Sequence, residues 1–412
     1  MKTKLSLLEK YARLAIRKGV NVQKGQPLVI KASVQDYEFI RLCVKEAYKA
    51  GSGKVTINWN DEEISKSEYS ALTSQQLSVI PNWMEGKIKD EHQNGACYLS
   101  IYSATPGYLK DIPQEKLNAA SKAFSKKMGK YQKYTMNNIG QWSILALPSS
   151  GWAKVVFPND KEEVAYKKLE KAIYATCRVT KDNDPIKEWQ KHDAEILKHN
   201  EILTNYNFKA LHFTNSLGTD LTVGLVKNHL WAGGNCTSAS GVVFDPNMPT
   251  EETFCMPEKT GVEGIVYASK PLSYNGKVIE DFWFKFEKGK VISFGAKKEK
   301  AALKKLLDYD SGSRYLGEVA LISYDSPVSK TGILFFNTLF DENAACHLAL
   351  GRPYPENLKG GLEMNDAQLK KAGANSSLVH EDFMFGTKDL KVDGIKYDGS
   401  IVPVFRKGNF VI

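Results

Sequence analysis

The sequence predicts a doubly wound α/β domain over residues 1–190, followed by an α+β domain over residues 191–412. Helix and strand patterns alternate over the first 180 residues, which is typical of parallel βαβ units. The chain then becomes strongly polar around residues 181–200, and short strand patterns follow at the close spacing of antiparallel hairpins. A chain of 412 residues is also long enough to divide into two or three domains with separate cores.

The first domain opens with a helix and then a strand–helix–strand unit. Apolar residues recur at helical spacing over residues 7–15, and residues 26–30 form an apolar strand pattern. We expect a helix over residues 36–50, ended by Gly51, and a second strand over residues 55–59. Because a helix separates these strands, they are expected to pair in parallel. Further patterns predict strands at 97–101 and 143–147 and helices at 115–133 and 161–176.

The second domain has the pattern of antiparallel hairpins with interspersed helices. A charged helix is expected after the turn sequence that ends at Pro185. The segments beyond it are short, rich in β-branched and aromatic residues, and separated by turn residues. Strands are predicted at 208–213, 221–225, 264–268, 281–286 and 290–294.

Composition and charge exclude several classes of protein. The chain is 42% hydrophobic and 25% charged, which is ordinary for a globular protein and excludes collagen and wholesale disorder. Its longest apolar runs are strand-sized, far below the roughly 20 residues of a membrane span, so no membrane partner is expected. The formal net charge is +9, but acidic residues interrupt basic runs such as 297–300, which argues against nucleic-acid binding. The sequence Gly51–Lys54 lacks the earlier glycine of a phosphate-binding loop.

The N-terminus and the cysteines indicate a cytoplasmic protein. Charged Glu9 and Lys10 interrupt the first apolar segment, so we expect no secretory signal. The six cysteines show no CxxC spacing, which argues against a zinc ribbon. A disulfide framework would be unusual in so long a chain. Reduced core cysteines in a cytoplasmic protein are the expected reading.

A histidine and an aspartate two residues apart form the first candidate metal site. The alternation over residues 376–386 predicts a strand, on which His380 and Asp382 face one side and Glu381 faces the other. An imidazole and a carboxylate that converge in this way provide half of a divalent-metal site. Taken alone the pattern is weak, because ordinary hydrogen-bonded polar residues show the same spacing.

His347 lies in an alanine-rich segment that predicts a short helix over residues 341–350, with acidic residues at its start and Gly351 just past its end. Glu342 precedes the histidine by five residues, so on a regular helix the two share a face only if Glu342 lies in a loosened first turn. His347 is therefore either a core residue or a ligand. No pattern around the other histidines points to chemistry: His92, His192, His199, His212 and His229.

Two acidic positions stand in unusual surroundings. Glu251 and Glu252 are adjacent and follow a turn, within a segment of small and apolar residues. Glu318 lies at the mouth of a very apolar strand, where burying a carboxylate costs several kcal/mol unless a partner compensates. That partner is either a metal ion or a basic side chain such as Arg314.

Together these motifs resemble the thermophilic-aminopeptidase family of dinuclear metallopeptidases, of the aminopeptidase S, aminopeptidase T and aminopeptidase II type. The order and spacing of four motifs carry the resemblance, and a stretch near the N-terminus extends it over essentially the whole chain. The matching stretches are residues 8–26, 248–252, 315–321, 337–351 and 380–384.

The resemblance implies two divalent metal ions and an active-site tyrosine, Tyr354. Glu252 rather than Glu251 matches the family position, and Glu342 matches a further acidic position despite the helix geometry above. The chain departs from the pattern at Phe385, where relatives tend to carry a smaller aliphatic residue, which puts the shape of the pocket in question. The implied metal ligands are Glu252, Glu318, Glu342, His347, His380 and Asp382.

This ligand set suits a metallo-aminopeptidase that removes the N-terminal residue from short peptides. Two ions bridged by a carboxylate lower the pKa of a shared water and polarise the scissile carbonyl group. Glu318 would bridge the ions or take the proton of the water, and Tyr354 would donate a hydrogen bond to the tetrahedral oxyanion. A carboxylate-rich site with two histidines accepts zinc, cobalt or manganese.

Two other functions remain open from the sequence. The same ligands would serve another dinuclear hydrolase, such as a dipeptidase or an amidase. Alternatively, a non-catalytic protein could bind a small ligand in its first domain and a structural ion at the acidic cluster. The resemblance itself further implies a homodimer and peptide substrates with a free amino terminus.

Overall fold

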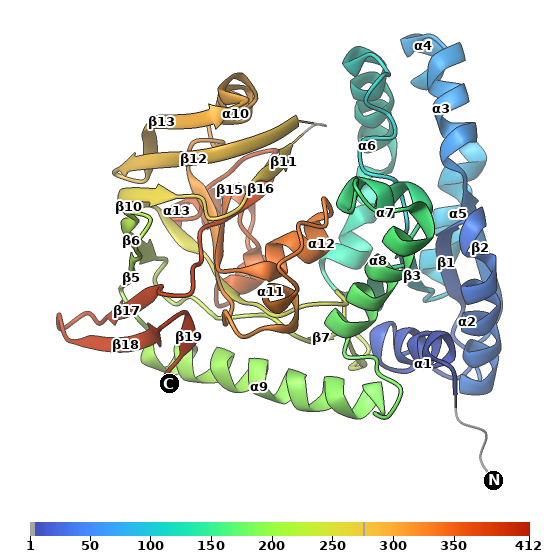
Figure 1. Cartoon of the computed structure of the whole chain (residues 1–412), viewed down its shortest axis with the longest axis horizontal. Helices are drawn as coiled ribbons and strands as arrows, with labels where there is room; N and C mark the ends of the chain where they lie inside the picture. The colour runs from blue at the N-terminus through green and yellow to red at the C-terminus, as the bar shows by residue number, and fades with distance from the viewer. Residues whose placement is uncertain (1–4, 275–276) are drawn as a thin grey trace. The chain divides into compact units, whose positions relative to one another are not determined.

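The structure, a computed structural model, describes residues 5–274 and 277–412. It consists of two compact units, and helices and strands are mixed along the chain (Figure 1). The predicted mixed α/β content with a parallel sheet is confirmed. The first unit runs to Lys191 and includes Asn235–Pro249, and the second comprises His192–Gly234 and Thr250–Ile412.

The first unit is built on a four-stranded parallel sheet in the order β2-β1-β3-β4. Every strand and helix predicted before residue 180 overlaps an observed element. Helix α2 ends where Gly51 takes a left-handed conformation with φ of 85°, which glycine adopts without strain. The strands are β1 (Leu28–Ser33), β2 (Val55–Asn60), β3 (Cys97–Tyr102) and β4 (Trp142–Ala146). The helices are α1 (Leu7–Leu14), α2 (Tyr37–Ala50), α3 (Glu62–Ala71), α4 (Ser74–Leu77), α5 (Asn82–Gln93), α6 (Gln114–Met136), α7 (Ser150–Val156) and α8 (Glu162–Thr176).

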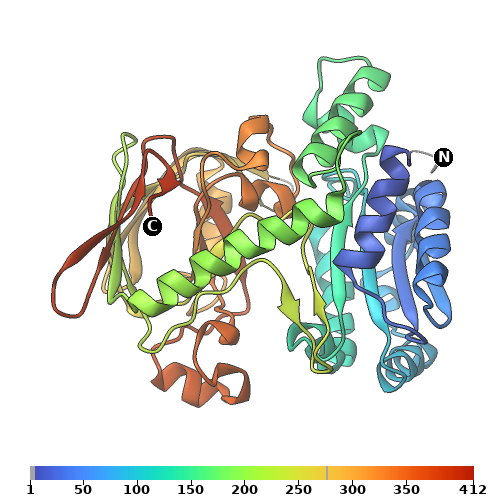
Figure 2. The same cartoon turned by 90° about the horizontal axis from the view of Figure 1, so that it is seen from below.

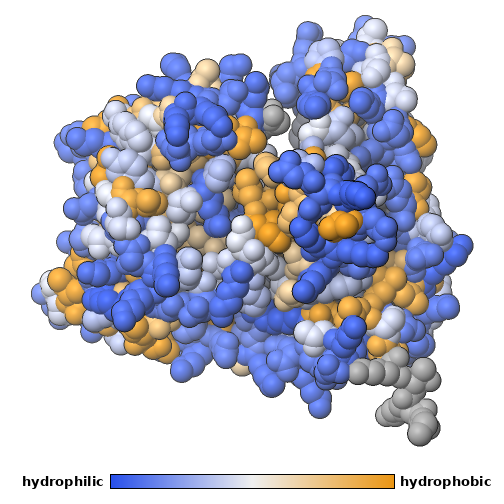
Figure 3. Space-filling model, viewed as in Figure 1, coloured by the Kyte–Doolittle hydropathy of each residue, from blue (hydrophilic) through white to orange (hydrophobic). Residues whose placement is uncertain are grey.

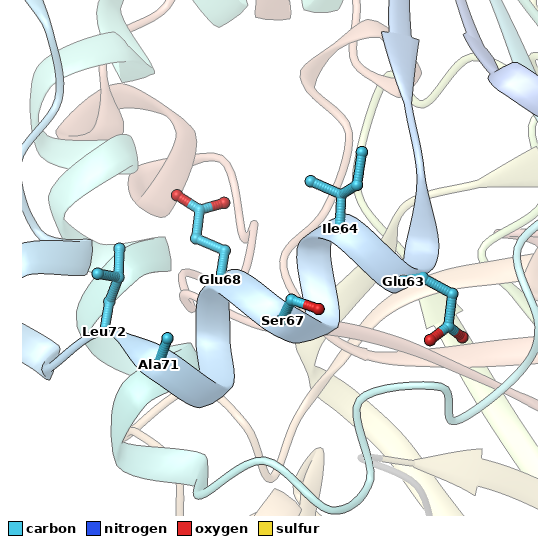
Figure 4. A pocket seen from close by; sticks show the side chains of 6 residues that line it. All are labelled: Glu63, Ile64, Ser67, Glu68, Ala71 and Leu72. Atoms are coloured by element: carbon cyan, nitrogen blue, oxygen red, sulfur yellow. The ribbon is translucent and has the colours of Figure 1, made fainter.

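Helices α3 and α5 bury none of their residues, so no apolar stripe marked them in the sequence. A shallow hollow runs along α3, and Ile64 in it is 69% exposed. On the face of the molecule seen in Figure 3, hydrophilic residues predominate and hydrophobic patches lie between them. The side chains that line the hollow are Glu63, Ile64, Ser67, Glu68, Ala71 and Leu72 (Figure 4).

The segment Asn235–Pro249 adds a small hairpin to the first unit, formed by β7 (Cys236–Thr237) and β8 (Val243–Phe244). Beyond the hairpin, Asp245 is fully buried and lies 3.1 Å from the ammonium group of Lys18. The backbone oxygen of Asp245 also accepts a hydrogen bond of 2.7 Å from the hydroxyl of Ser143 at β4. Residues far apart in the sequence therefore complete the first unit.

A buried lysine, Lys10, holds the loop that follows α8. The ammonium group of Lys10 on α1 donates to three backbone oxygens, those of Thr180, Lys181 and Asn183, at 2.8, 3.0 and 2.5 Å. Only 9% of Lys10 is exposed. Since a buried ammonium group is costly unless its donors are used, these three bonds both satisfy the charge and fix the loop that follows α8.

Helix α9 (Pro185–Tyr206) carries the chain from the first unit into the second, and it is the long green helix of Figure 2. It is the charged helix expected after Pro185. The described residues include no helix that is both long and apolar enough to cross a membrane.

The second unit contains a large antiparallel sheet and a smaller one of four strands, β16-β15-β14-β9. The large sheet has the order β11-β12-β10-β6-β5-β17-β18-β19, and β13 pairs with β12. The strands of the large sheet are β5 (Ala210–Thr214), β6 (Asp220–Leu225), β10 (Pro257–Tyr267), β11 (Leu272–Tyr274), β12 (Lys277–Glu287), β13 (Lys290–Lys298), β17 (Lys391–Ile395), β18 (Ile401–Arg406) and β19 (Asn409–Phe410). The smaller sheet comprises β9 (Thr253–Cys255), β14 (Leu316–Leu321), β15 (His347–Gly351) and β16 (His380–Met384), and the helices are α10 (Lys300–Leu307), α11 (Pro327–Thr331), α12 (Thr338–Asp341) and α13 (Asp366–Lys371).

The predicted helix over residues 341–350 is wrong. Helix α12 ends at Asp341, a 3-10 turn covers Glu342–Ala344, and His347–Gly351 forms strand β15. Alanine and leucine favour a helix locally, but this segment is buried between β14 and β16, whose backbone groups pair with it on both sides. Tertiary pairing therefore overrides the local preference.

We expect Lys10→Met to lower the free energy of unfolding by about 2–3 kcal/mol, because it removes the three hydrogen bonds that the buried ammonium group donates to the loop after α8. Urea unfolding, monitored by circular dichroism, measures this change. Lys122→Met removes an exposed lysine on α6 and serves as the matched control, with an expected change below about 0.5 kcal/mol. Equal stability of the two variants would show that the Lys10 contacts contribute nothing.

Candidate metal centre

Three neighbouring strands bring four of the candidate ligands to one face of the smaller sheet (Figure 1 labels β15 and β16). Ala349 on β15 lies directly opposite Glu318 on β14 and opposite Asp382 on β16. Residues opposite one another in an antiparallel sheet point to the same side, as do residues two apart on one strand. His347 and His380 therefore share this side with the two carboxylates.

Small residues occupy the middle of this face. Ala349 lies between Glu318 and Asp382, and Gly351 lies opposite His380. Because alanine has only a methyl group and glycine has no side chain, the longer polar side chains on the flanking strands can converge above them. Sequence reasoning missed both residues, since nothing marks a small residue in a buried strand as part of a site.

The polar atoms meet at short distances. Nε2 of His347 lies 3.3 Å from Oε2 of Glu252 and 3.3 Å from Oε1 of Glu318. Nε2 of His380 lies 3.4 Å from Oδ1 of Asp382 and 3.9 Å from Oε2 of Glu318. The two oxygens of Glu318 thus face different histidines.

These residues form two groups that could each hold a metal ion. In each group one ligand atom per residue lies within 4.8 Å of the others. Glu318 belongs to both groups, which is the arrangement expected of a carboxylate that bridges two ions. The groups are Glu252, Glu318 and His347, and Glu318, His380 and Asp382.

The donor atoms fit a cation. Oδ1 of Asp382 is buried and accepts no hydrogen bond from any described residue. Nδ1 of His380 lies 2.6 Å from the carbonyl oxygen of Arg352, to which it must donate, so Nε2 is the atom that faces the carboxylates. A neutral imidazole would then direct a lone pair at carboxylate oxygens, and either a proton or a metal ion relieves that repulsion.

Burial and crowding shift the pKa values in the cluster. Burial raises the pKa of Glu318 to about 7, against the opposing effect of His347. Burial by itself would lower the pKa of His380, but Asp382 and Glu318 raise it to about 10. The pKa of Asp382 is lowered, because the two histidines outweigh the effect of burial. The cluster therefore favours cationic partners for its carboxylates.

Glu342 lies beside the cluster and outside both groups. Burial raises its pKa well above the ordinary value, and the charges of Asp382 and Glu252 raise it further. It begins the 3-10 turn after α12, so the helical spacing from His347 does not apply to it.

The two adjacent glutamates point to different partners. Glu252 faces His347, whereas Oε2 of Glu251 lies 3.7 Å from Nε2 of His192 on α9. The backbone nitrogen of Glu251 donates a hydrogen bond of 2.7 Å to Oδ1 of Asn343. Of the pair, Glu252 is the residue that joins the candidate ligands.

Tyr354 borders the cluster. Its ring centroid lies 4.9 Å from that of His380 and 5.8 Å from that of Phe254, and 40% of the residue is exposed. Burial of the hydroxyl raises its pKa well above the ordinary value, with a further contribution from the carboxylates. The phenol is therefore a hydrogen-bond donor at neutral pH. Phe385, the departure from the family pattern, is fully buried and packs edge-on against Phe213 in the core.

Known proteins match the chain over nearly its full length. The sequence profile of the thermophilic metalloproteases of family M29 matches residues 5–410. Aminopeptidase AmpS of Bacillus subtilis is 44% identical over 404 residues, which cover 98% of each chain. Aminopeptidase T of Thermus aquaticus is 40% identical over 406 residues, again with 98% of each chain covered.

A solved structure has the same fold. Wild-type AmpT from Thermus thermophilus superposes with a TM-score of 0.92 at 38% sequence identity, covering 98% of this chain and 99% of that one. The family resemblance inferred from the sequence motifs is thereby confirmed, and with it a requirement for divalent metal. The chain belongs to the M29 family of thermophilic metalloproteases.

Proposed function

We propose that the protein is a metal-dependent aminopeptidase that hydrolyses the N-terminal residue from short peptides at a two-metal site in its second unit. The observation that carries this proposal is the position of Glu318, whose two oxygens belong to two adjacent ligand groups. The relatives at 40–44% identity bear the name aminopeptidase, which supports the exopeptidase activity.

The chain's own residues would divide the work. Glu252, Glu318 and His347 would hold one ion, Glu318, His380 and Asp382 the other, and Glu342 would complete the site from the adjacent turn. Divalent ions bound there would supply the Lewis acidity that activates water and polarises a carbonyl group. Glu318 would accept the proton of the water. Tyr354, protonated and at the border of the cluster, would donate a hydrogen bond to the tetrahedral oxyanion.

Other functions are less well supported. A dipeptidase or an amidase would use equivalent ligands, but the relatives favour an aminopeptidase. A purely structural ion site would not need a carboxylate shared between two groups beside a protonated phenol. Zinc, cobalt and manganese all suit these ligands. A homodimer and a cytoplasmic location stay predictions.

Hydrolysis of short peptides tests the proposal. We expect the metal-loaded protein to release the N-terminal residue from peptides with a free amino terminus, and N-acetylation to abolish the release. Chromatography of the products, after chelation and after adding back zinc, cobalt or manganese, provides the measurement. Cleavage that survives acetylation would point to another dinuclear hydrolase, and cleavage unaffected by chelation would contradict the metal site.

We expect Glu318→Gln to lower kcat by about 10²- to 10⁴-fold, because an amide cannot take a proton from water. His380→Ala should abolish turnover through loss of bound metal, as measured by elemental analysis. Glu381→Gln is the matched control: Glu381 neighbours both ligands on the same strand, but its side chain faces the other side of the sheet. Near-normal activity of metal-loaded His380→Ala would disprove the ligand assignment.

Metal affinity should increase with pH. The pKa of His380 is raised to about 10 and that of His347 is also raised, so both imidazoles carry a proton at pH 7 when no metal is bound. A metal ion must displace these protons, and each displaced proton strengthens apparent binding about tenfold per pH unit. Calorimetric titration of the metal-free protein with zinc between pH 6 and 9, in two buffers of different ionisation enthalpy, counts the protons released. Affinity independent of pH would contradict the assignment.

A further inference from the structure

Glu252 differs from the other candidate ligands on the small sheet in how it is held. Glu318, His347, His380 and Asp382 lie on paired strands, whereas Glu252 precedes β9, whose pairing with β14 begins only at Thr253. Within the described part of the chain, its carboxylate has His347 as its ionic partner. The position of Glu252 must therefore be set by what holds the backbone on either side of it.

Asn200 on α9 holds the side that follows Glu252. Its Nδ2 donates a hydrogen bond of 3.1 Å to the backbone oxygen of Gly233, and its Oδ1 accepts a hydrogen bond from the hydroxyl of Thr253. Both Asn200 and Thr253 are buried. Donor and acceptor are both used, so the amide has one orientation and joins two separate segments beside Glu252.

Gly233 lies directly against Glu252. Its φ is 137°, and a Cβ atom at this position would come within 2.2 Å of the backbone oxygen of Glu252. The adjoining residue, Ala232, exchanges two backbone hydrogen bonds with Phe254, of 3.0 and 2.8 Å. A glycine is required here because the two backbones are too close for a side chain. Asn200 thus fixes a segment that is itself pressed against Glu252.

His192, eight residues earlier on α9, holds the side that precedes Glu252. Its Nε2 donates to the backbone oxygen of Thr250 at 2.7 Å. Eight helical residues rise about 12 Å, and the three residues from Thr250 to Thr253 span about 10 Å when extended. Two side chains of one helix can therefore hold both ends of the segment that carries Glu252.

We propose that Asn200 and His192 are positioning residues, through which α9 sets the place of the Glu252 carboxylate at the metal centre. The inference rests on the proposed two-metal function. Glu252 belongs to only one of the two ligand groups, the one with Glu318 and His347. Loosening its support should lower the affinity for one ion. The ion held by Glu318, His380 and Asp382 should bind with its original affinity.

Titration of the metal-free protein with Co²⁺ tests this inference, because the visible absorption of the ion reports each binding step separately from activity. We expect the wild-type chain to bind two ions. In Asn200→Ser one ion should bind about 10–100-fold more weakly, the usual effect of removing a group that orients a ligand, while the other keeps its affinity. Thr253→Val, which preserves the branched shape of the side chain but removes the hydroxyl donor, should show the same selective loss. If Asn200→Ser does not fold, the result with Thr253→Val tests the inference alone.

Thr204→Val provides the matched control. Thr204 lies one turn further along α9, and its hydroxyl accepts a hydrogen bond of 3.1 Å from the backbone nitrogen of Trp231, two residues before Gly233, so it bonds neither to Gly233 nor to Thr253. Both Co²⁺ ions should bind this variant as they bind the wild type.

The outcomes separate the two proposals. A wild-type chain that binds fewer than two ions contradicts the proposed function and with it this inference. A wild-type chain that binds two ions overturns this inference alone in either of two cases. In the first, Asn200→Ser and Thr253→Val bind both ions normally or lose both equally. In the second, Thr204→Val lowers the affinity for the same ion as much as Asn200→Ser and Thr253→Val do.

Discussion

Four carboxyl groups and two imidazoles meet in the interior of the second unit, and this concentration of negative charge is the constraint on which the site depends. A buried carboxylate is costly without a partner, and two histidines cannot compensate four acids even when both are protonated. The residues respond by holding protons: Glu318 and Glu342 have raised pKa values, and so do both histidines. Divalent cations supply the charge that the side chains lack, so metal binding and the chemistry of the site follow from the same imbalance.

The sheet around this cluster tolerates the imbalance because it is rigid. β14 and β15 consist entirely of buried residues, and their apolar side chains on the opposite face pack into the main core. Fixed strands hold the acids together although their charges repel one another, since separating them would break the ladder of backbone hydrogen bonds. Repulsion between these carboxylates would separate them if they lay on a loop, but here the packing of a whole sheet opposes it.

Much of this could be predicted from the sequence, and the reasons for the failures are physical. The alternation around His380 correctly placed that histidine and Asp382 on one side of a strand, because a half-buried strand leaves a period of two. The strand that carries His347 was mistaken for a helix, because a fully buried strand has no alternation and its alanines and leucines favour helices. His192 and Asn200 gave no signal at all: each acts through a backbone atom distant in the sequence, and no local pattern encodes such a partner.

The hairpin of Asn235–Pro249 makes the first unit discontinuous in sequence, and this has a consequence for the order in which the protein can form. During synthesis the parallel sheet emerges early, but the carboxylate that pairs with Lys18 belongs to Asp245, which is made only after the first segment of the second unit, His192–Gly234. The first unit can therefore not be completed, and the Lys18–Asp245 ion pair cannot form, before residue 245 has been made. A chain that ends at residue 190 would lack Asn235–Pro249 and with it part of the first unit, so residues 1–190 are a poor candidate for expression on their own.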